Sequence, residues 1–236
     1  MLLLGAAGCS RTLDPNLYPT PESLYQASVE AYEKGDCNLA EQGFQRLMFE
    51  LPPRDPRHAN VRYYLGSCQL KGHLELEAAQ QFRRVADDFP RSELAPSALL
   101  KVGEAYASLW DDPDLDPSYG ETALSTFTEL LGRYPNSPAA DTARTRIHDL
   151  QEMFAEKGYK NGVFYLRLRA YDSAILYFKD VVATYGTTSY AGKAVVKLIE
   201  AFSKIGYEEE KNEMCLYRTQ YYPDATGAEK YCDSGG

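Results

Sequence analysis

The stretch that decides the fold runs from Ala59 to Pro90 and reads ANVRYYLGSCQLKGHLELEAAQQFRRVADDFP. It contains two apolar segments of helical length, separated by a Gly-His pair that is typical of a turn. Small residues at Gly66 and Ala78 let two helices approach closely, and Phe82 fills the gap between successive units. Pro90 ends the second helix. The stretch therefore predicts a helical hairpin.

The same order of residues recurs along the chain, and it resembles the 34-residue tetratricopeptide (TPR) repeat. Three further units match it: from Pro21, with Leu24, Ala27, Ser28, Ala40, Phe44, Leu47 and Pro52; from Pro96, with Leu99, Val102, Gly103, Tyr106, Ala123, Phe127, Leu130 and Pro135; and from Ala155, with Gly162, Tyr165, Ala174, Phe178 and Val181. A fifth unit from Gly192 is degenerate, with Lys211 and Cys215 at two template positions. We expect an all-α, right-handed solenoid of about five TPR-type hairpins, or about ten helices. The alternative is an unrelated helical bundle.

Two segments interrupt the regular spacing. Eight extra residues, from Trp110 to Pro117, separate the helices of the third unit and have the composition of a loop. Apolar residues at helical spacing from residue 138 onward predict one long helix over about 138–169. Gly158 and Gly162 disfavour a helix interior, so a break at Gly158 is the competing interpretation.

Composition limits the classes of function. The chain has 25 basic and 34 acidic residues, a net charge of −9, which disfavours binding to nucleic acid. No apolar run approaches the roughly 18 residues that cross a bilayer.

The first residues, MLLLGAAGCS, form an apolar run that ends in small residues before Cys9. They resemble a bacterial lipoprotein signal, in which the cysteine carries the lipid. Residues 10–21 are rich in proline and predict an extended tether. We therefore expect attachment to a membrane through Cys9, the alternative being an apolar terminus with an incidental cysteine. The expected divisions are 1–9 signal remnant, 10–21 tether, 22–137 units one to three, 138–223 units four and five with the long helix, and 224–236 C-terminal tail.

The four other cysteines lack the close pairing of a zinc site. In an oxidising compartment they could form two disulfides, with three possible connectivities. We favour Cys37 with Cys68, because the first lies at a hairpin turn and the second late in the next helix, and Cys215 with Cys232. Unpaired thiols that fill core positions are the alternative.

The first helices of TPR hairpins turn one face toward the binding groove of the solenoid. In the first two units, three tyrosines at the template positions of this face make a mixed apolar and hydroxyl-bearing trough, suited to an extended peptide with aromatic side chains. The candidate groove residues are Tyr25, Val29, Tyr32, Tyr63, Ser67, Leu100 and Glu104. The competing interpretation is that the tyrosines pack against neighbouring helices and that the chain's own N-terminus fills the groove.

No pattern of residues indicates catalysis, a metal site or a cofactor. Asp112, Asp114 and Asp116 alternate as in a calcium loop, but the glycine and glutamate that such a loop requires are absent. The three histidines are scattered along the chain. We expect a protein that is not an enzyme.

Two phrases, YPTPESLYQA from Tyr18 and FYLR…AYDSAI from Phe164, together with the lipoprotein-like start, resemble the BamD family of TPR lipoproteins of the outer-membrane β-barrel assembly machinery. The resemblance implies a lipid-anchored scaffold on the periplasmic face of the outer membrane. It also implies that the C-terminal units bind the periplasmic domains of the barrel-forming subunit, that other assembly lipoproteins are partners, and that the N-terminal units bind the C-termini of unfolded barrel proteins. Many relatives have Arg-Gly-Ala-Tyr where this chain has Leu168-Arg169-Ala170-Tyr171. The resemblance therefore makes Arg167 and Arg169 the candidates for a basic docking contact.

An alternative function is a TPR adaptor that works with peptidoglycan or with energy-transducing complexes of the envelope. Such proteins share the linker style seen from Tyr134 to Ala139. The lipoprotein-like start favours the assembly scaffold. An enzyme or regulatory subunit would need a convergent acid–base or metal cluster, which the sequence lacks.

Overall fold

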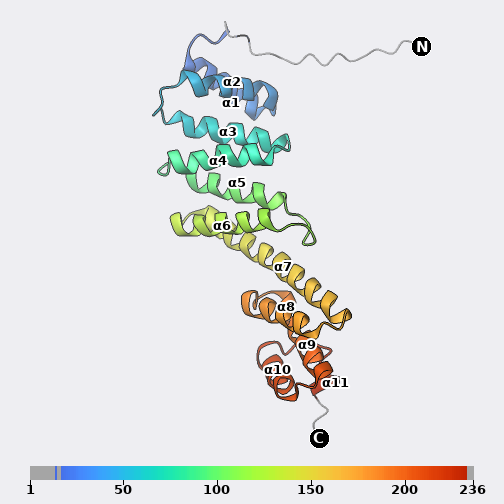
Figure 1. The fold of residues 1–236 in the computed structure, drawn as a ribbon. Coiled ribbons are helices and arrows are strands. Elements are labelled where there is room, and N and C mark those ends of the chain that lie inside the picture. The colour runs from blue at the N-terminus through green and yellow to red at the C-terminus, as the bar shows by residue number, and fades with distance from the viewer. Residues whose placement is uncertain (1–13, 15–16, 233–236) are drawn as a thin grey trace, which may run out of the picture. The chain divides into compact units, whose positions relative to one another are not determined.

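The computed structural model describes residue 14 and residues 17–232, so Cys9 and half of the expected tether lie outside the described residues. The described part is helical and contains no strand. Figure 1 labels its eleven helices: α1 (Pro21–Glu33), α2 (Cys37–Glu50), α3 (Arg57–Lys71), α4 (Glu75–Asp88), α5 (Ala95–Ser108), α6 (Ser118–Arg133), α7 (Pro138–Arg167), α8 (Tyr171–Thr184), α9 (Ser189–Ile205), α10 (Glu208–Tyr221) and α11 (Glu229–Cys232). The expected all-α fold is confirmed.

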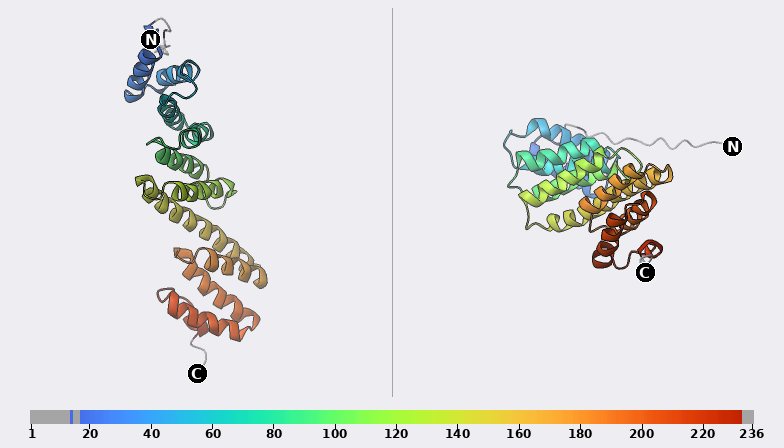
Figure 2. Two further views of the ribbon diagram at one scale, coloured as in Figure 1. Left: turned by 90° about the vertical axis from the view of Figure 1, so that its left-hand side faces the viewer. Right: turned by 60° about the horizontal axis from the view of Figure 1, so that its bottom comes forward.

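The helices belong to two compact units. The first contains residues up to Leu109 together with Tyr119–Arg144, and the second contains Trp110–Ser118 and the residues from Thr145 onward. Within the first unit α1 to α5 each pack on the next helix, and within the second α8 packs on α9 and α9 on α10 (Figure 2). Each unit is therefore a row of helical hairpins.

One contact recurs inside these hairpins. A methyl group placed on Gly66 would lie 3.1 Å from the ring of Phe82, and one on Gly162 would lie 2.5 Å from the ring of Phe178. The same substitution at Gly103 would overlap the ring of Phe127. All three phenylalanine rings are fully buried. The aromatic ring therefore occupies the space that the missing side chain leaves, which is why the template pairs a small residue with an aromatic one.

The chain enters the first hairpin earlier than the sequence suggests. Thr20 caps α1: its side chain accepts a hydrogen bond from the Ser23 backbone, and the Ser23 side chain accepts one from the Thr20 backbone. Pro21, expected in the tether, is the first residue of the helix. Tyr18 is half-buried against the first core cluster, so it too belongs to the folded part.

The long helix α7 is continuous from Pro138 to Arg167, and the interpretation with a break at Gly158 is wrong. Its glycines serve packing: a methyl group on Gly158 would lie 2.7 Å from the side chain of Val181. The helix ends two residues before the expected position, because Arg169 takes a left-handed conformation with φ of 61°. Its first turns belong to the first unit and the remainder to the second.

The inserted segment is a loop, as expected, and contacts at its first residue and in its middle fix it to α7. Trp110 is only 1% exposed and its ring lies 4.5 Å from that of Phe154. Lys157 donates hydrogen bonds from Nζ to the backbone carbonyls of Pro113 and Leu115, at 2.9 and 2.8 Å. Trp110 is therefore part of the core of the second unit, while most of the acidic residues that follow it are exposed.

None of the described helices combines the length and the apolar character that crossing a bilayer requires.

Candidate peptide-binding face and docking turn

The seven candidate groove residues lie on the first helices of three successive hairpins of the first unit. Each of them is half-buried, neither enclosed in the core nor fully open to solvent. Their positions are Tyr25, Val29 and Tyr32 on α1, Tyr63 and Ser67 on α3, and Leu100 and Glu104 on α5. We call these seven residues, together with Asn60 and Tyr64 of α3, the tyrosine face.

Side chains of α1 and α3 meet directly on this face. Asn60 donates a hydrogen bond from Nδ2 to the Tyr25 hydroxyl at 3.1 Å. The rings of Tyr32 and Tyr64 lie 4.7 Å apart, and Lys71 Nζ lies 5.1 Å from the centroid of the Tyr32 ring. The face is thus continuous from the first hairpin to the second.

Tyr63 continues the face toward α5. Its ring packs edge-on against Phe82 at 5.3 Å. Burial raises the pKa of the Tyr63 hydroxyl; the positive charge of Lys101 opposes this rise, and Tyr32 and Glu104 add to it. Lys101 donates a hydrogen bond to Glu104 at 2.8 Å. An ion pair therefore stands beside the tyrosine hydroxyls.

The rings of Tyr25, Tyr32 and Tyr63 pack against neighbouring helices, as the competing interpretation expects, and their binding of a peptide stays a prediction. Tyr25 and Tyr32 pack against the core cluster of the first hairpin, and Tyr63 packs against that of the second. Because the rings remain half-buried, they also present surface to solvent. Such rings are already ordered by their neighbours, so a ligand that contacts them would restrict little further motion.

Sequence reasoning missed Tyr64, which stacks at 5.6 Å on Phe44 as well as contacting Tyr32. Burial raises the pKa of its hydroxyl, and the nearby tyrosines and Glu33 raise it further. A signal was present, because Tyr64 follows Asn60 by four residues and therefore lies on the same side of α3.

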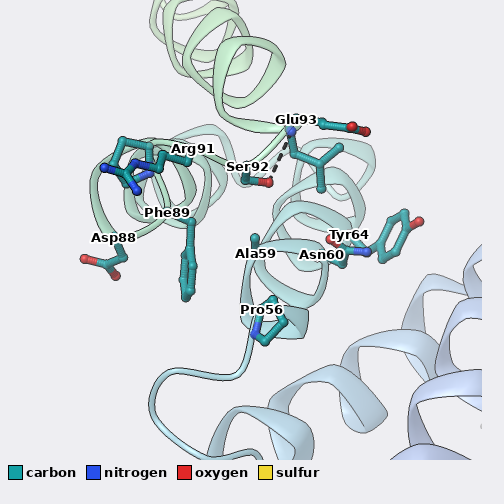
Figure 3. A pocket seen from close by; sticks show the side chains of 11 residues that line it. Pro56, Ala59, Asn60, Tyr64, Asp88, Phe89, Arg91, Ser92 and Glu93 are labelled. Atoms are coloured by element: carbon teal, nitrogen blue, oxygen red, sulfur yellow. Dashed lines mark hydrogen bonds between the residues drawn. The ribbon is translucent and has the colours of Figure 1, made fainter.

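A hollow of about 760 Å³ opens beside Tyr64 and Asn60. Figure 3 shows the side chains of α3 on one side of it, with the ring of Phe89 and the residues that lead into α5 on the other. Within that connection, the Leu94 backbone donates a hydrogen bond to the Ser92 hydroxyl at 3.2 Å. The hollow shares residues with the tyrosine face and enlarges the surface it offers.

The candidate docking arginines lie at the turn between α7 and α8 in the second unit. Arg167 is the last residue of α7, and Arg169 has a left-handed backbone. Both are exposed, and neither has an ion pair within the described chain. Three large apolar side chains of this part are also exposed: Phe164 by 57%, Leu168 by 61% and Leu176 by 69%. We call these five residues the docking turn.

Aromatic stacking supports this turn from beneath. Tyr165 of α7 and Tyr177 of α8 stack at 5.4 Å with an angle of 11° between their planes. Phe164 packs edge-on against Tyr165 at 5.4 Å. Phe164 of the docking turn therefore packs on a stacked aromatic pair.

Both favoured cysteine pairs are disulfide-bonded in the structure. Cys37 and Cys68 join the first hairpin to α3, with Cα atoms 5.3 Å apart. Cys215 and Cys232 join α10 to α11, with Cα atoms 5.7 Å apart. These separations are normal for disulfides. No cluster of metal-ligating side chains is found in the described part of the chain.

Comparison with known families tests the resemblance. The profile of the YfiO family, described as outer membrane lipoprotein, matches residues 19–216, which covers all five hairpins apart from the last turns of α10. The chain belongs to this family.

Curated YfiO-family relatives carry the name outer membrane protein assembly factor BamD. The protein of Caulobacter vibrioides is 27% identical over 189 residues, which are 80% of this chain and 62% of that protein. The protein of Rickettsia prowazekii is 24% identical over 95% of this chain and 88% of its own length. The chain thus spans less than two thirds of the Caulobacter protein. Among solved structures, a thermophilic TPR protein of Thermus thermophilus is 20% identical over 86% of this chain and 92% of its own, with a TM-score of 0.41.

Proposed function

We propose that this chain is a non-catalytic scaffold in the assembly of outer-membrane β-barrel proteins. The family match and the assembly-factor names of its relatives support this role. In the proposal, the chain is attached to the periplasmic face of the outer membrane through a lipid on Cys9. Its two units hold different partners.

The tyrosine face is proposed to bind C-terminal segments of unfolded barrel proteins. The observation that carries this proposal is the group of half-buried rings and hydroxyls that joins α1 to α3, with Leu100 and the charged Glu104 beyond it on α5. Ordered aromatic rings provide contact area for apolar side chains, while their hydroxyls and Asn60 can bond to an extended backbone.

The docking turn is proposed to bind the periplasmic domains of the barrel-forming subunit. Three exposed apolar side chains beside two arginines without ion pairs suit a partner surface that is apolar with an acidic rim. Other assembly lipoproteins remain expected partners, although no surface of this chain is assigned to them.

Peptide binding on the tyrosine face is tested by measuring the affinity of the purified chain for a labelled C-terminal peptide of a barrel protein. Tyr32→Ala is expected to weaken binding by about tenfold, since it removes a ring shared between two hairpins. Tyr25→Phe, which keeps the ring and removes only the hydroxyl, is expected to weaken it by about threefold. The matched control is Tyr119→Ala, which alters an exposed tyrosine on α6 of the same unit. If the control weakens binding as much as Tyr32→Ala, the face is not the binding site.

The docking turn is tested by co-purification with the periplasmic domains of the barrel-forming subunit. Reversing the charge in Arg167→Glu or Arg169→Glu is expected to reduce affinity by about tenfold. Lys204→Glu, an exposed lysine at the end of α9 in the same unit, is the matched control for net charge. An equal loss in the control would indicate general electrostatic attraction and no docking at the turn.

A further inference from the structure

The first unit has a second hollow, outside the tyrosine face. It measures about 770 Å³ and lies where the end of α2, the α2–α3 loop, the start of α3 and the end of α4 meet. Its wall includes Met48, Phe49, Arg54, His58, Arg62 and Phe89. Nothing in the proposed function uses it.

An unusually exposed aromatic side chain stands at its edge. Phe49 is 90% exposed, the highest value among the large apolar side chains of the described residues. The fully buried Phe44 and Leu47 of the same helix show which side of α2 forms the core. Phe49 lies off that side, so packing within the unit does not explain it.

The wall also holds positive charge without matching carboxylates. Arg62 is half-buried, and burial lowers the pKa of its guanidinium; the charge of Arg84 lowers it further, while Asp88 opposes both. Within the described residues neither Arg54 nor Arg62 has a carboxylate in ion-pair distance, and Arg62 binds only the neutral Gln81, at 3.1 Å.

Neighbouring carboxylates are engaged elsewhere. Glu50 pairs with Arg46 and Asp55 with Arg57, each at 2.6 Å. Asp88 also lines the hollow and offsets one of its two arginines. The wall therefore keeps an excess of positive charge, in a chain whose net charge is −9.

Two buried polar atoms of the wall have no partner among the described residues. His58 is 6% exposed and its Nε2 lies 3.0 Å from the Pro52 carbonyl, to which it must donate, while Nδ1 is buried and has no hydrogen bond. Nε of Arg62 is also buried and has no hydrogen bond. Buried polar groups are usually paired, so both atoms remain available for hydrogen bonds to a group that enters the hollow.

We propose that this hollow binds an internal acidic segment of a partner protein, with an apolar side chain against Phe49 and carboxylates on Arg54 and Arg62. A single chain-terminal carboxylate matches less well, because the two arginines lie on different elements, the loop and α3. A flat lipid surface also matches less well, because His58 and Nε of Arg62 are recessed. The site contains no residue of the tyrosine face, shares Asp88 and Phe89 with the hollow beside that face, and extends the scaffold by a third contact.

The test titrates a labelled peptide with the core Glu-Phe-Glu and both ends blocked into the full chain. Matched peptides carry Lys-Phe-Lys or Glu-Gly-Glu. Binding is expected for Glu-Phe-Glu, weaker for Glu-Gly-Glu and absent for Lys-Phe-Lys. Phe49→Ser and Arg54→Gln are each expected to weaken Glu-Phe-Glu binding by about fivefold. Both side chains are exposed and outside the core, so both variants are expected to fold.

Lys34→Gln removes an exposed cation of the same unit that does not line the hollow, and it is expected to change the affinity by less than about twofold. Equal binding of Lys-Phe-Lys, equal affinity in all variants or no binding of Glu-Phe-Glu would each overturn the proposal. So would sensitivity to Tyr32→Ala in place of Phe49→Ser, which would place the peptide on the tyrosine face. Phosphatidylglycerol vesicles form the last arm: if they alone bind and Phe49→Ser releases them, the surface contacts a membrane and the proposal is wrong.

Discussion

In the α3–α4 hairpin the ring of Phe82 lies over Gly66, whereas in the α9–α10 hairpin the corresponding positions are Cys215 and Ile199. Ile199 is fully buried, and Cys215 is packed against the same cluster. The large side chain has moved from the second helix of the hairpin to the first.

The two hairpins also differ in how much of their second helix is buried. In the α3–α4 hairpin the second helix contributes five buried residues to its core: Ala78, Ala79, Phe82, Val85 and Ala86. In α10 the only buried residue is Lys211, whose ammonium group binds Glu208. A helix with so little apolar burial needs another attachment, and the disulfide from Cys215 to Cys232 provides one. The comparison teaches that the α3–α4 hairpin is held by a fully buried core, whereas the last hairpin combines partly buried side chains of α10 with a covalent bond.

The largest effect is expected from removing an aromatic ring that packs on a glycine inside a regular hairpin. Phe127→Ala leaves a cavity beside Gly103 and should lower the free energy of unfolding of the first unit by about 3–5 kcal/mol. Urea denaturation followed by circular dichroism measures it. Phe49→Ala, at an exposed phenylalanine of the same unit, should cost less than about 0.5 kcal/mol. Similar losses in both variants would remove packing as the explanation.

The next effect concerns the covalent attachment. Cys215 and Cys232 are 17 residues apart, and a disulfide closing a loop of this size stabilises by about 3 kcal/mol in the chain-entropy view. Cys215→Ser should therefore make α10 and α11 open to proteolysis while the α3–α4 hairpin stays protected. Limited proteolysis with mass spectrometry measures both regions in one sample. If α10 resists cleavage equally in the variant, its few apolar contacts suffice and the contrast between the hairpins fails.

A smaller effect is expected from adding a methyl group between α5 and the ring of Phe127. Gly103→Ala should cost about 2 kcal/mol, because the added methyl overlaps the Phe127 ring, and Phe127→Leu in the same chain should recover part of the loss. Gly132→Ala is the matched control on α6: nothing lies within 4 Å of the added methyl, so the better helix former should gain up to about 1 kcal/mol. Thermal melts of Gly103→Ala, of Phe127→Leu alone, of the double variant and of the control measure the coupling. Additive changes would show that glycine and ring do not share one space.

The sequence predicted those features that repeat. Gly66 with Phe82 and Gly162 with Phe178 were identified by spacing alone, because each pair lies within one hairpin and recurs at fixed distance along the chain. The candidate residues of the tyrosine face lie on the expected helices for the same reason. Their ability to bind a peptide stays a prediction.

Features that depend on unique contacts were not predictable. Trp110 lies in a segment with the composition of a loop, and its burial depends on Phe154, far along the chain. The end of α7 is set by the left-handed conformation of Arg169, which an arginine does not signal. Phe49 and His58 belong to no template position, so the second hollow appears only when α2, α3 and α4 are placed together.

The smallest expected effect concerns the loop that leads from the first hairpin into the second. The Asp55 carboxylate accepts hydrogen bonds from Arg57 Nε and Nη2, at 2.9 and 2.6 Å. The hydrogen bonds from Arg57 lower the pKa of Asp55 to about 2. In the unfolded chain the value is about 3.9, so the pair stabilises the folded state above about pH 4, and this contribution is lost as the pH falls toward 2.

Asp55→Asn should therefore reduce stability by about 1 kcal/mol near neutral pH, since the pair is partly exposed, and should lose less than the parent chain on acidification. Urea midpoints measured at about pH 6 and about pH 2.5 give both quantities. Arg57→Gln removes the other partner and should show the same convergence at low pH, with an additional loss from its ion pair to Glu22 at 2.9 Å. If both variants keep the full acid dependence of the parent, other carboxylates determine it. The link between the first two hairpins would then depend on packing and on the disulfide from Cys37 to Cys68, as the last hairpin depends on its own.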